Sequence, residues 1–560
     1  MSRPLVECVP NFSEGRDAAT LAAITAAIAA VPGVSLLDTD PGVATHRTVV
    51  TFVAPPEAAL EAAFAAIAVA AARIDMRAHS GAHPRMGATD VCPFVPVRDI
   101  TLAECAALAR RLAARVGAEL GIPVYLYAEA AADPSRRELS VLRAGEYESL
   151  PDKLATLPPD HGPTAYSDAV ARTGATVIGA RPFLVAWNLN LNTRNVKKAQ
   201  KIAALLREKG IYRKDAEGNI VRDADGVGIR DPGLFPRVQG IGWFIAEYDR
   251  AQISLNVFDT AAAPLHAIME AARGLAHAEG VVVTGSELVG LVPRDALLAA
   301  GRAYLAGGGA NPGAPEAEVI EAAIRGLGLR DVKPFDPGQA IVERRVAADG
   351  PLVRATVRGF TDTLASSAPA PGGGSVAALC GALATGLAAM VGQLSTGRKG
   401  LAHRDADWAA LAVAAQDHRE AFLAAVDADT AAFDAVMAAF ALPKATDADR
   451  ARRRPAIVAA TRGAIAVPLD VLERAAACLP LLATAATGNP NARSDAGVAA
   501  LTLRAAAEGA WLNVATNLSG LPADERPALR QRADAARDAV VTATEALLAT
   551  LRAEVAGDAG

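Results

Sequence analysis

Two histidines four residues apart, His79 and His83, stand in the polar segment HSGAHPRMGATD (79–90), which interrupts an apolar and regular part of the chain. On one helix this spacing would bring two imidazoles together as metal ligands. Pro84 directs His83 away from helical backbone, Gly81 also interrupts a helix, and no third ligand stands at a suggestive spacing. The sequence therefore disfavours a metal site. It leaves two hypotheses for His83: acid–base catalysis, because imidazole titrates near neutral pH, and a structural role in capping a loop.

Asp40 is a candidate to orient a catalytic imidazole. It follows an expected strand in the segment LLDTDPG, where side chains at strand ends meet loops. A solvated aspartate in a turn fits the same pattern, so both interpretations stay open.

A carboxylic acid also lies within an apolar helical stripe in the C-terminal part of the chain. The stripe repeats at alternating spacings of four and three residues and comprises Phe422, Val426, Asp429, Phe433, Val436 and Phe440. Burial among phenylalanines would raise the pKa of Asp429 and let the protonated acid donate near neutral pH. The alternative is a buried acid that pairs with an arginine or caps a neighbouring helix. Asp427 and Asp434 fall off the stripe and are expected to be solvated.

Glycines precede an expected helix in SAPAPGGGSVAA (367–378), which contains Gly372, Gly373, Gly374 and Ser375. A glycine-rich turn lets an anion approach the free N–H groups of a helix start. No lysine follows, so a carboxylate ligand fits at least as well as a nucleotide phosphate, and a flexible hinge is the alternative. The segment TGNPNARSDAGVAA (487–500) is a similar polar turn that enters a helix and contains Asn489, Arg493 and Asp495.

The elements that must position these residues change character along the chain. Up to about residue 328, strand patterns such as LVECVP and HRTVVTFVA alternate with helical patterns, which predicts α/β layers of β-α-β units in two successive segments. The charged stretch 214–232 is expected to be an exposed hairpin or loop. Beyond about residue 353, alanine-rich helical patterns with almost no strand signal predict an all-α helical bundle.

Two runs in this helical part have alternative interpretations. Residues 376–394 are uncharged and long enough to span a bilayer, but their alanine and glycine content favours a buried helix in a close-packed bundle. Residues 447–456 (DADRARRRPA) are basic, which indicates a solvated helix end or, less favoured, a contact with the anionic tail of a ligand.

Composition limits the classes of function. The 560 residues are enough for about three or four domains. A net charge of −5 gives no basic field for nucleic acid. Five separated cysteines without a C-x-x-C pair argue against disulfides and thiolate zinc, and favour a reducing cytoplasm. The first residues lack the apolar segment of a secretory signal, so secretion is not expected.

Long mixed motifs over nearly the whole chain resemble the formiminotransferase-cyclodeaminase family of folate enzymes in histidine breakdown. LVECVPNFSEGRD, DMRAHSGAHPRMGATDVCPFVPV, RAGEYESL and PDHGPTAYSDAVARTGATVIGARPFLVAWNLNLNT resemble its transferase half. SAPAPGGGSVAA, AFLAAVDADTAAFDAV and GNPNARSDAGVAA resemble its cyclodeaminase half. The resemblance implies a transferase half of two α/β subdomains (1–181 and 182–328), a linker (329–352) and an all-α cyclodeaminase domain (353–560).

The resemblance also implies roles for particular residues. His83, in H-P-R-M-G, corresponds to the catalytic histidine of the transferase, and Asp429, in V-D-A-D, to the proton donor of the cyclodeaminase; Asp40 remains the candidate to orient His83. The folate-binding stretch maps to 162–174 and includes Gly162, Pro163, Thr164, Ala165, Tyr166 and Gly174, and folate binding is also predicted at Gly372, Gly373, Gly374 and Ser375. The guanidinium groups of Arg47, Arg85 and Arg181 are candidates to bind glutamate carboxylates.

The implied activity is transfer of the formimino group from N-formimino-L-glutamate to tetrahydrofolate, followed by cyclisation to 5,10-methenyltetrahydrofolate with loss of ammonia. This describes a transferase and a lyase in one chain, with polyglutamylated tetrahydrofolate as co-substrate, no metal, no nucleic acid, no membrane and a ring-shaped homo-oligomer in the cytoplasm. The alternatives are a non-catalytic folate-binding protein and a membrane or oligomeric scaffold based on 376–394.

Overall fold

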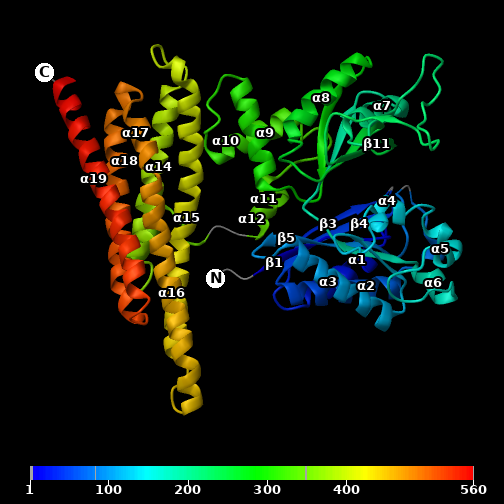
Figure 1. Cartoon of the computed structure of the whole chain (residues 1–560), viewed down its shortest axis with the longest axis horizontal. Coiled ribbons are helices and arrows are strands. Elements are labelled where there is room, and N and C mark those ends of the chain that lie inside the picture. Colours follow the sequence, from blue (N-terminus) through cyan, green and yellow to red (C-terminus); the bar gives the residue numbers. More distant parts are fainter. Residues whose placement is uncertain (1–3, 44, 82, 347–349, 559–560) are drawn as a thin grey trace. The chain divides into compact units, whose positions relative to one another are not determined.

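The computed structural model describes residues 4–43, 45–81, 83–346 and 350–558 and contains two compact units (Figure 1). The first unit comprises Met1–Leu297 with Leu327–Ala347, and the second comprises Leu298–Gly326 with Ala348–Gly560. The first unit contains a seven-stranded and a four-stranded β-sheet with their helices and a small two-stranded sheet, and the second unit is helical. The predicted fold class, an α/β half followed by an all-α part, is confirmed.

Seven strands form the first sheet: β1 (Leu5–Cys8), β2 (Asn11–Phe12), β3 (Ser35–Gly42), β4 (Arg47–Ala54), β5 (Thr89–Arg98), β6 (Val124–Ala128) and β7 (Thr176–Ala180). Both β1 and β2 pair with β4 and β5, and β3 extends the sheet beyond β4. The order continues from β5 to β7 and β6. Only β5, β7 and β6 run parallel, so the predicted β-α-β pattern accounts for one side of a mixed sheet.

One face of this sheet packs on α1 (Ala18–Ala29), α2 (Pro56–Arg73) and α3 (Leu102–Arg115). The small side chains of alanine-rich α2 let its backbone come close to the sheet, and the core between them includes Phe52 and Phe94. On the other face, α4 (Leu139–Leu142) and α5 (Leu150–Thr156) contribute Leu142 and Leu150 to a smaller cluster around Tyr125.

The second sheet is antiparallel, in the order β11 (Val238–Ile245), β12 (Arg250–Val257), β8 (Val185–Leu191) and β13 (Val283–Val289). Its helices include α7 (Val196–Leu206) and α8 (Leu265–Ala278). In β8, the apolar residues Trp187, Leu189 and Leu191 alternate with Asn188 and Asn190, and both sets are buried. The stretch predicted to be an exposed hairpin joins the two-residue strands β9 (Ile211–Tyr212) and β10 (Arg230–Asp231).

The helical unit consists mainly of α14 (Gly373–Ser395), α15 (Asp405–Ala441), α16 (Asp447–Ala477), α17 (Leu479–Ala486), α18 (Arg493–Asn517) and α19 (Arg526–Asp558), preceded by α13 (Val357–Leu364). Its core joins these helices through alanine, leucine and the buried Trp408 and Phe422. Among the described residues, α14 alone is long and apolar enough to cross a membrane, but most of its apolar window is buried within the bundle. The buried-helix interpretation of 376–394 therefore agrees with its surroundings.

The grouping of residues in space differs from the predicted domain limits. We predicted that the second α/β segment extends to 328, yet Leu298–Gly326, with the end of α9 (Arg294–Gly307) and α10 (Glu316–Leu327), belongs to the helical unit. Polar contacts explain this: Asn311 donates to Thr396 (2.7 Å), and Arg302 pairs with Asp417 (2.8 Å). The predicted linker 329–352 contains the short helices α11 (Pro337–Ala340) and α12 (Val342–Val346).

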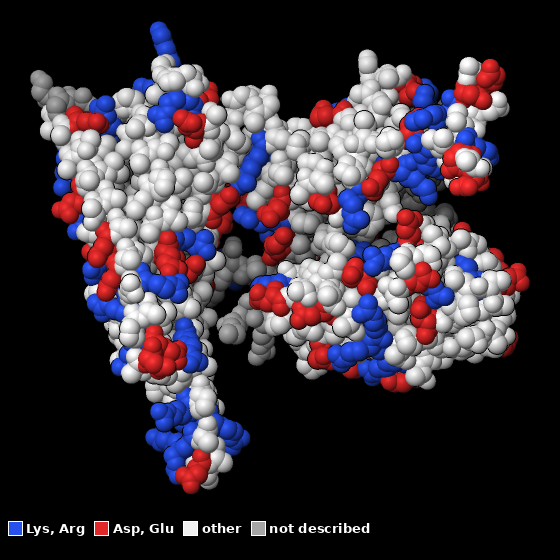
Figure 2. Space-filling model, in the orientation of Figure 1, with Lys and Arg blue, Asp and Glu red and all other residues white. Residues whose placement is uncertain are grey.

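The basic run 447–456 begins α16 at the end of the α15–α16 hairpin, where Figure 2 shows lysine and arginine side chains gathered. Arg450 pairs with Asp447 and Arg452 with Asp449 on the same helix. Both arginines are exposed, as in the solvated helix end that the sequence favoured.

Two close backbone approaches join the His83 segment to the predicted folate-binding stretch. A Cβ atom on Gly87 would lie 2.5 Å from the carbonyl oxygen of Ala175. A Cβ atom on Gly174, whose φ is +67°, would lie 2.3 Å from the carbonyl oxygen of Met86. Only glycine allows the two segments to meet in this way.

We expect Gly174→Ala to destabilise the protein by at least about 3 kcal/mol, because the new methyl group would meet backbone that cannot move aside. Gly121→Ala is the matched control, since Gly121 also has a positive φ (+63°) but has no neighbouring heavy atom within 4 Å of an added Cβ. It should cost only about 1 kcal/mol. Equal losses in urea unfolding would show that φ, and not the close approach, governs this position.

Candidate functional site

His83 lies in the loop between the single turn η1 (Met76–Ala78) and β5, beside the first residue of β4. The guanidinium Nη1 of Arg47 is 2.5 Å from His83 Nδ1 and 3.2 Å from Nε2. Nδ1 also lies 2.7 Å from the carbonyl oxygen of Pro84. The structure thus brings together two residues, Arg47 and His83, that the sequence had singled out separately.

A buried carboxylate, Asp90, connects this pair to a second arginine. Its Oδ2 atom lies 3.0 Å from Arg47 Nη1 and 2.5 Å from Arg143 Nη2, and its Oδ1 accepts from the backbone N–H of Met86 (3.0 Å). The Asp90 side chain is fully buried, and those of Arg47 and Arg143 are 11% and 14% exposed. Burial raises the pKa of Asp90, but Arg143 and Arg47 outweigh it and lower the pKa, so Asp90 is ionised.

The same surroundings keep His83 neutral. Burial, followed by the charges of Arg47 and Arg143, lowers the pKa of His83 to about 3. Arg47 can only donate a hydrogen bond and the Pro84 carbonyl can only accept one, so the two contacts at Nδ1 belong to different tautomers. In either tautomer the acceptor nitrogen of the ring faces Arg47. His83 can therefore take a proton from another molecule only after Arg47 releases it.

His79 and His83 do not form a metal-binding pair. Arg85 Nε donates to His79 Nδ1 (3.2 Å), and His79 Nε2 donates to the carbonyl oxygen of His46 (2.9 Å). The rings of His79 and His46 stack at 4.3 Å between centroids. His79 thus fixes the loop before His83, and no group of three or more possible ligands for a metal occurs in the described part of the chain.

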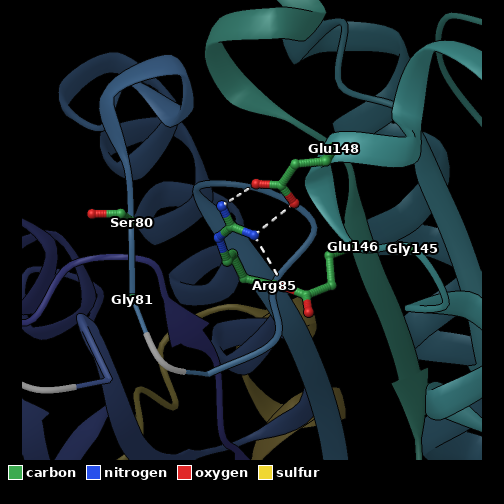
Figure 3. A pocket seen from close by; sticks show the side chains of 6 residues that line it. All are labelled: Ser80, Gly81, Arg85, Gly145, Glu146 and Glu148. Carbon is green, nitrogen blue, oxygen red and sulfur yellow. Dashed lines mark hydrogen bonds and ion pairs between the residues drawn. The ribbon is translucent and has the colours of Figure 1, made fainter.

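A cavity of about 470 Å³ lies between this loop and the turn that follows Arg143, lined by Ser80, Gly81, Arg85, Gly145, Glu146 and Glu148 (Figure 3). Arg85 was predicted to bind a substrate carboxylate. Instead its guanidinium pairs with Glu148 (2.6 Å) and Glu146 (3.0 Å) and is nearly buried. Because two carboxylates already neutralise Arg85, the structure gives it a part in joining the loop to the turn.

In the described part of the chain, neither Asp40 nor Arg181 forms a hydrogen bond or ion pair with His83. Asp40 is in β3, opposite Val49, and its charge acts on Tyr248. Asp90 is the carboxylate that contacts Arg47 beside His83, and the role of Asp40 in orienting His83 stays a prediction. Arg181 follows β7 and interacts electrostatically with Glu7, whose pKa burial raises to about 7.

The predicted folate-binding stretch runs beside the His83 loop as an exposed segment. Tyr166 is 42% exposed, and Gly162, Pro163, Thr164 and Ala165 precede it at the surface or partly buried. Asp168, in α6 (Asp168–Thr173), lies 3.6 Å from Arg77, and Tyr147 donates to the carbonyl oxygen of Ala171 (2.5 Å). The backbone of Tyr147 in turn donates to Arg85 (2.9 Å), so the stretch, the turn and the loop are directly connected.

In the helical unit, Asp429 of α15 faces the first turn of α14. The hydroxyl of Ser375 lies 3.2 Å from Asp429 Oδ2 and donates to the carbonyl oxygen of Val426 (2.9 Å). A Cβ atom on Gly374 would lie 2.1 Å from Asp429 Oδ1, so glycine is required for this approach, while Gly372 caps the helix and Gly373 begins it. Burial raises the pKa of Asp429, and hydrogen bonds from the side chain and backbone of Ser375 offset part of the rise.

Burial is the largest cause of this shift, as predicted. Phe422 and Val426 of the apolar stripe are buried and Phe433 is partly buried, whereas Phe440, about three turns beyond Asp429, is 51% exposed. The glycine start of α14 also lies against Asp429 and contributes to its burial. Asp427, which we predicted to be solvated, accepts hydrogen bonds from the backbone N–H groups of Leu352 (2.9 Å) and Val353 (3.1 Å).

The polar turn at 487–500 has mainly a structural role in this arrangement. Asn489 is buried, donates to the carbonyl oxygen of Leu394 (3.1 Å) and accepts from Asn491 (3.0 Å). Arg493 pairs with Glu554 of α19 (3.2 Å).

Sequence reasoning missed Asp90 and Arg143. Asp90 ends the motif HSGAHPRMGATD, but an aspartate at a strand start is common and gives no separate signal. Arg143 opens the motif RAGEYESL, where it resembles any surface arginine. Their pairing joins residues far apart in the chain, and only the fold reveals it.

Comparison with known proteins agrees with the two-part architecture. The model described as "Formiminotransferase domain, N-terminal subdomain" matches residues 5–181, "Formiminotransferase domain" matches 186–347, and "Formiminotransferase-cyclodeaminase" matches 356–538. The fold and its two candidate sites define a multifunctional protein with an α/β transferase half and a helical half. The chain belongs to the formiminotransferase-cyclodeaminase family.

Individual relatives cover the whole chain or one half. Formimidoyltransferase-cyclodeaminase from Rattus norvegicus is 43% identical over 526 residues, which are 93% of each chain. Glutamate formimidoyltransferase from Thermoplasma acidophilum is 43% identical over 305 residues, 54% of this chain and 92% of the relative. Methenyltetrahydrofolate cyclohydrolase from Methylorubrum extorquens is 39% identical over 178 residues, 32% of this chain and 85% of the relative.

We expect His83 to remain neutral in the unliganded protein down to at least pH 5, because its pKa is lowered to about 3. Replacing Arg47 by Gln removes a positive charge that opposes protonation, so the pKa of His83 should rise by at least about one unit. Titration of the imidazole Cε1 resonance by NMR, assigned by its loss in His83→Gln, checks both points. A His83 resonance that titrates near pH 6.5 in the unsubstituted protein would contradict them.

Proposed function

We propose that this protein transfers the formimino group from N-formimino-L-glutamate to tetrahydrofolate and then cyclises 5-formiminotetrahydrofolate to 5,10-methenyltetrahydrofolate, with release of ammonia. The observation that carries the proposal is the presence, in one chain, of two separate acid–base sites, each within the half whose family model matches. The first site supplies a neutral imidazole and the second a carboxylic acid with a raised pKa.

In the transfer reaction, N5 of tetrahydrofolate attacks the formimino carbon of the donor. The attacking amine loses a proton as the tetrahedral adduct forms, and the leaving nitrogen of glutamate gains one. A single imidazole can accept the first proton and return it to the leaving nitrogen. His83 is neutral and thus able to accept, and Arg47 lies next to it to interact with negative charge on the donor.

In the cyclisation, N10 attacks the formimino carbon that is now attached to N5, and the formimino nitrogen leaves as ammonia. The leaving nitrogen needs a proton, and N10 must lose one. Asp429 can donate the first, because burial favours its protonated form. Ser375 fixes the orientation of the carboxyl group by its hydrogen bond to Oδ2.

Several further properties are part of the proposal. The second activity makes the protein a lyase, and neither reaction requires a metal ion. A tetrahydrofolate with a polyglutamate tail is the proposed form of the co-substrate. We also propose a cytoplasmic location, because the buried thiols of Cys8 and Cys92 share a hydrogen bond at 3.6 Å and not a disulfide. We propose a homo-oligomer because an apolar groove between α14 and α15 exposes Leu383 and Met390.

We expect His83→Ala to abolish formimino transfer and to leave cyclisation of supplied 5-formiminotetrahydrofolate within about twofold of normal. Asp429→Asn should do the reverse and accumulate 5-formiminotetrahydrofolate, because asparagine cannot donate a carboxyl proton. Removing an acid–base group of this kind lowers a rate by about 10²–10⁴-fold. Absorbance of the methenyl product and chromatography of the folates measure the two steps separately.

His403→Ala is a suitable control, since His403 is exposed and lies in a different unit from His83. It should leave both rates unchanged. If either His83→Ala or Asp429→Asn stopped both reactions in a folded protein, the assignment of one reaction to each site would be wrong.

A further inference from the structure

The Arg47–Asp90–Arg143 cluster carries more positive than negative charge. Two guanidinium groups share one carboxylate, and His83 beside them is neutral. Arg47 stays charged at neutral pH, although burial lowers its pKa to about 10. A partly buried excess positive charge is unfavourable unless an anion reaches it. The cluster therefore fits an anionic group from outside the chain.

The hydrogen bonds within the cluster leave Nη1 of Arg143 available as a donor. Arg143 uses Nε (3.2 Å) and Nη2 to hold Asp90, and no partner for its Nη1 occurs among the described residues. Arg47 uses Nε and Nη2 to hold Asn11, so only its Nη1 is divided between Asp90, His83 and Pro84. A carboxylate could bind between the two Nη1 groups, because guanidinium donors match carboxylate geometry.

We propose that Arg143, together with Arg47, forms the receptor for the α-carboxylate of the formimino donor, and that Asp90 holds both arginines in place for it. This inference rests on the proposed transfer reaction. It assigns to Arg143 a role in substrate specificity that the sequence did not indicate.

The position of the cluster beside His83 indicates that the bound carboxylate belongs to the formimino donor and not to tetrahydrofolate. Arg47 contacts His83 directly, so an anion bound to Arg47 lies close to the reacting atoms. In the donor, the α-carboxylate is attached to the carbon next to the nitrogen that leaves. In tetrahydrofolate, the p-aminobenzoyl group separates the glutamate carboxylates from N5. Only the donor can place a carboxylate and its reacting bond in this site together.

Binding of the carboxylate also prepares His83 to act as a base. The charged groups that act on His83 are Arg47 of β4, Arg143 of the turn after α4, and Asp90 of β5. An added carboxylate would draw Arg47 Nη1 away from the imidazole, which frees its acceptor nitrogen, and would offset the two positive charges. The pKa of His83 should therefore rise when the donor binds.

A donor without the α-carboxylate, N-formimino-4-aminobutyrate, provides the test. For the unsubstituted enzyme, we expect kcat/KM with N-formimino-L-glutamate to exceed that with the truncated donor by at least 100-fold. In Arg143→Gln this preference should fall to below tenfold, because the variant has lost a carboxylate contact that the truncated donor cannot make. The ratio does not depend on the fraction of the variant that is folded.

Three further readouts separate this role from a structural one. The KM for tetrahydrofolate should change by less than about twofold in Arg143→Gln, and Arg143→Lys should restore part of the preference because it keeps the charge. Arg137→Gln, a nearby exposed arginine, should behave as the unsubstituted enzyme. Adding N-formimino-L-glutamate without folate should raise the NMR titration midpoint of His83 by at least one pH unit, and this rise should be absent in Arg143→Gln.

An unchanged preference in Arg143→Gln, or an equal rise of KM for both substrates, would overturn the inference while leaving the proposed function intact. Absence of any transfer by the unsubstituted enzyme would instead contradict the proposed function itself.

Discussion

The sharing of Asp90 between Arg47 and Arg143 is the interaction on which the transferase site depends. It joins β4, β5 and the turn after α4, which are distant in sequence, and it places a charged guanidinium group beside His83. The ionised Asp90 is stable in a buried position only because two arginines compensate its charge. Replacing either arginine would therefore change both the shape of the loop and the charge that acts on His83.

The second site also contains a partly buried carboxyl group, but its partners among the described residues are hydrogen-bond donors and not arginines. Asp429 lies against the first turn of α14, where glycines allow a carboxyl group to approach the backbone and the backbone N–H of Ser375 donates to it. Hydrogen bonds from the helix start favour the ionised form, whereas burial favours the protonated form, and burial prevails. Because neither the ionised nor the protonated form of Asp429 is strongly favoured, the carboxyl group can both release and accept a proton. Burial is the largest cause of the shift at both sites: it lowers the pKa of His83, which Arg47 and Arg143 lower further, and it raises the pKa of Asp429.

Local patterns predicted the fold class, which is confirmed, and they drew attention to His83 and Asp429, whose catalytic roles stay predictions. Alternating strands and helices gave the α/β half, and helical periodicity gave the bundle and drew attention to Asp429. Pairings between distant segments were not predictable from such patterns. The sequence offered Asp40 as the partner acid, but the fold places Asp90 beside Arg47; it offered Arg85 for the substrate, but Glu146 and Glu148 neutralise that arginine. The same limit applies to Leu298–Gly326, whose side-chain contacts, not its sequence pattern, associate it with the helical unit.

The central claim is that one chain carries out both reactions in sequence. The most direct measurement is to supply the purified protein with tetrahydrofolate and N-formimino-L-glutamate and to quantify glutamate, ammonia and 5,10-methenyltetrahydrofolate over time. The account predicts that all three products form in a 1:1:1 ratio, with glutamate released no later than ammonia. Release of ammonia without glutamate, or failure to form any of the three from an active preparation of folded protein, would contradict it.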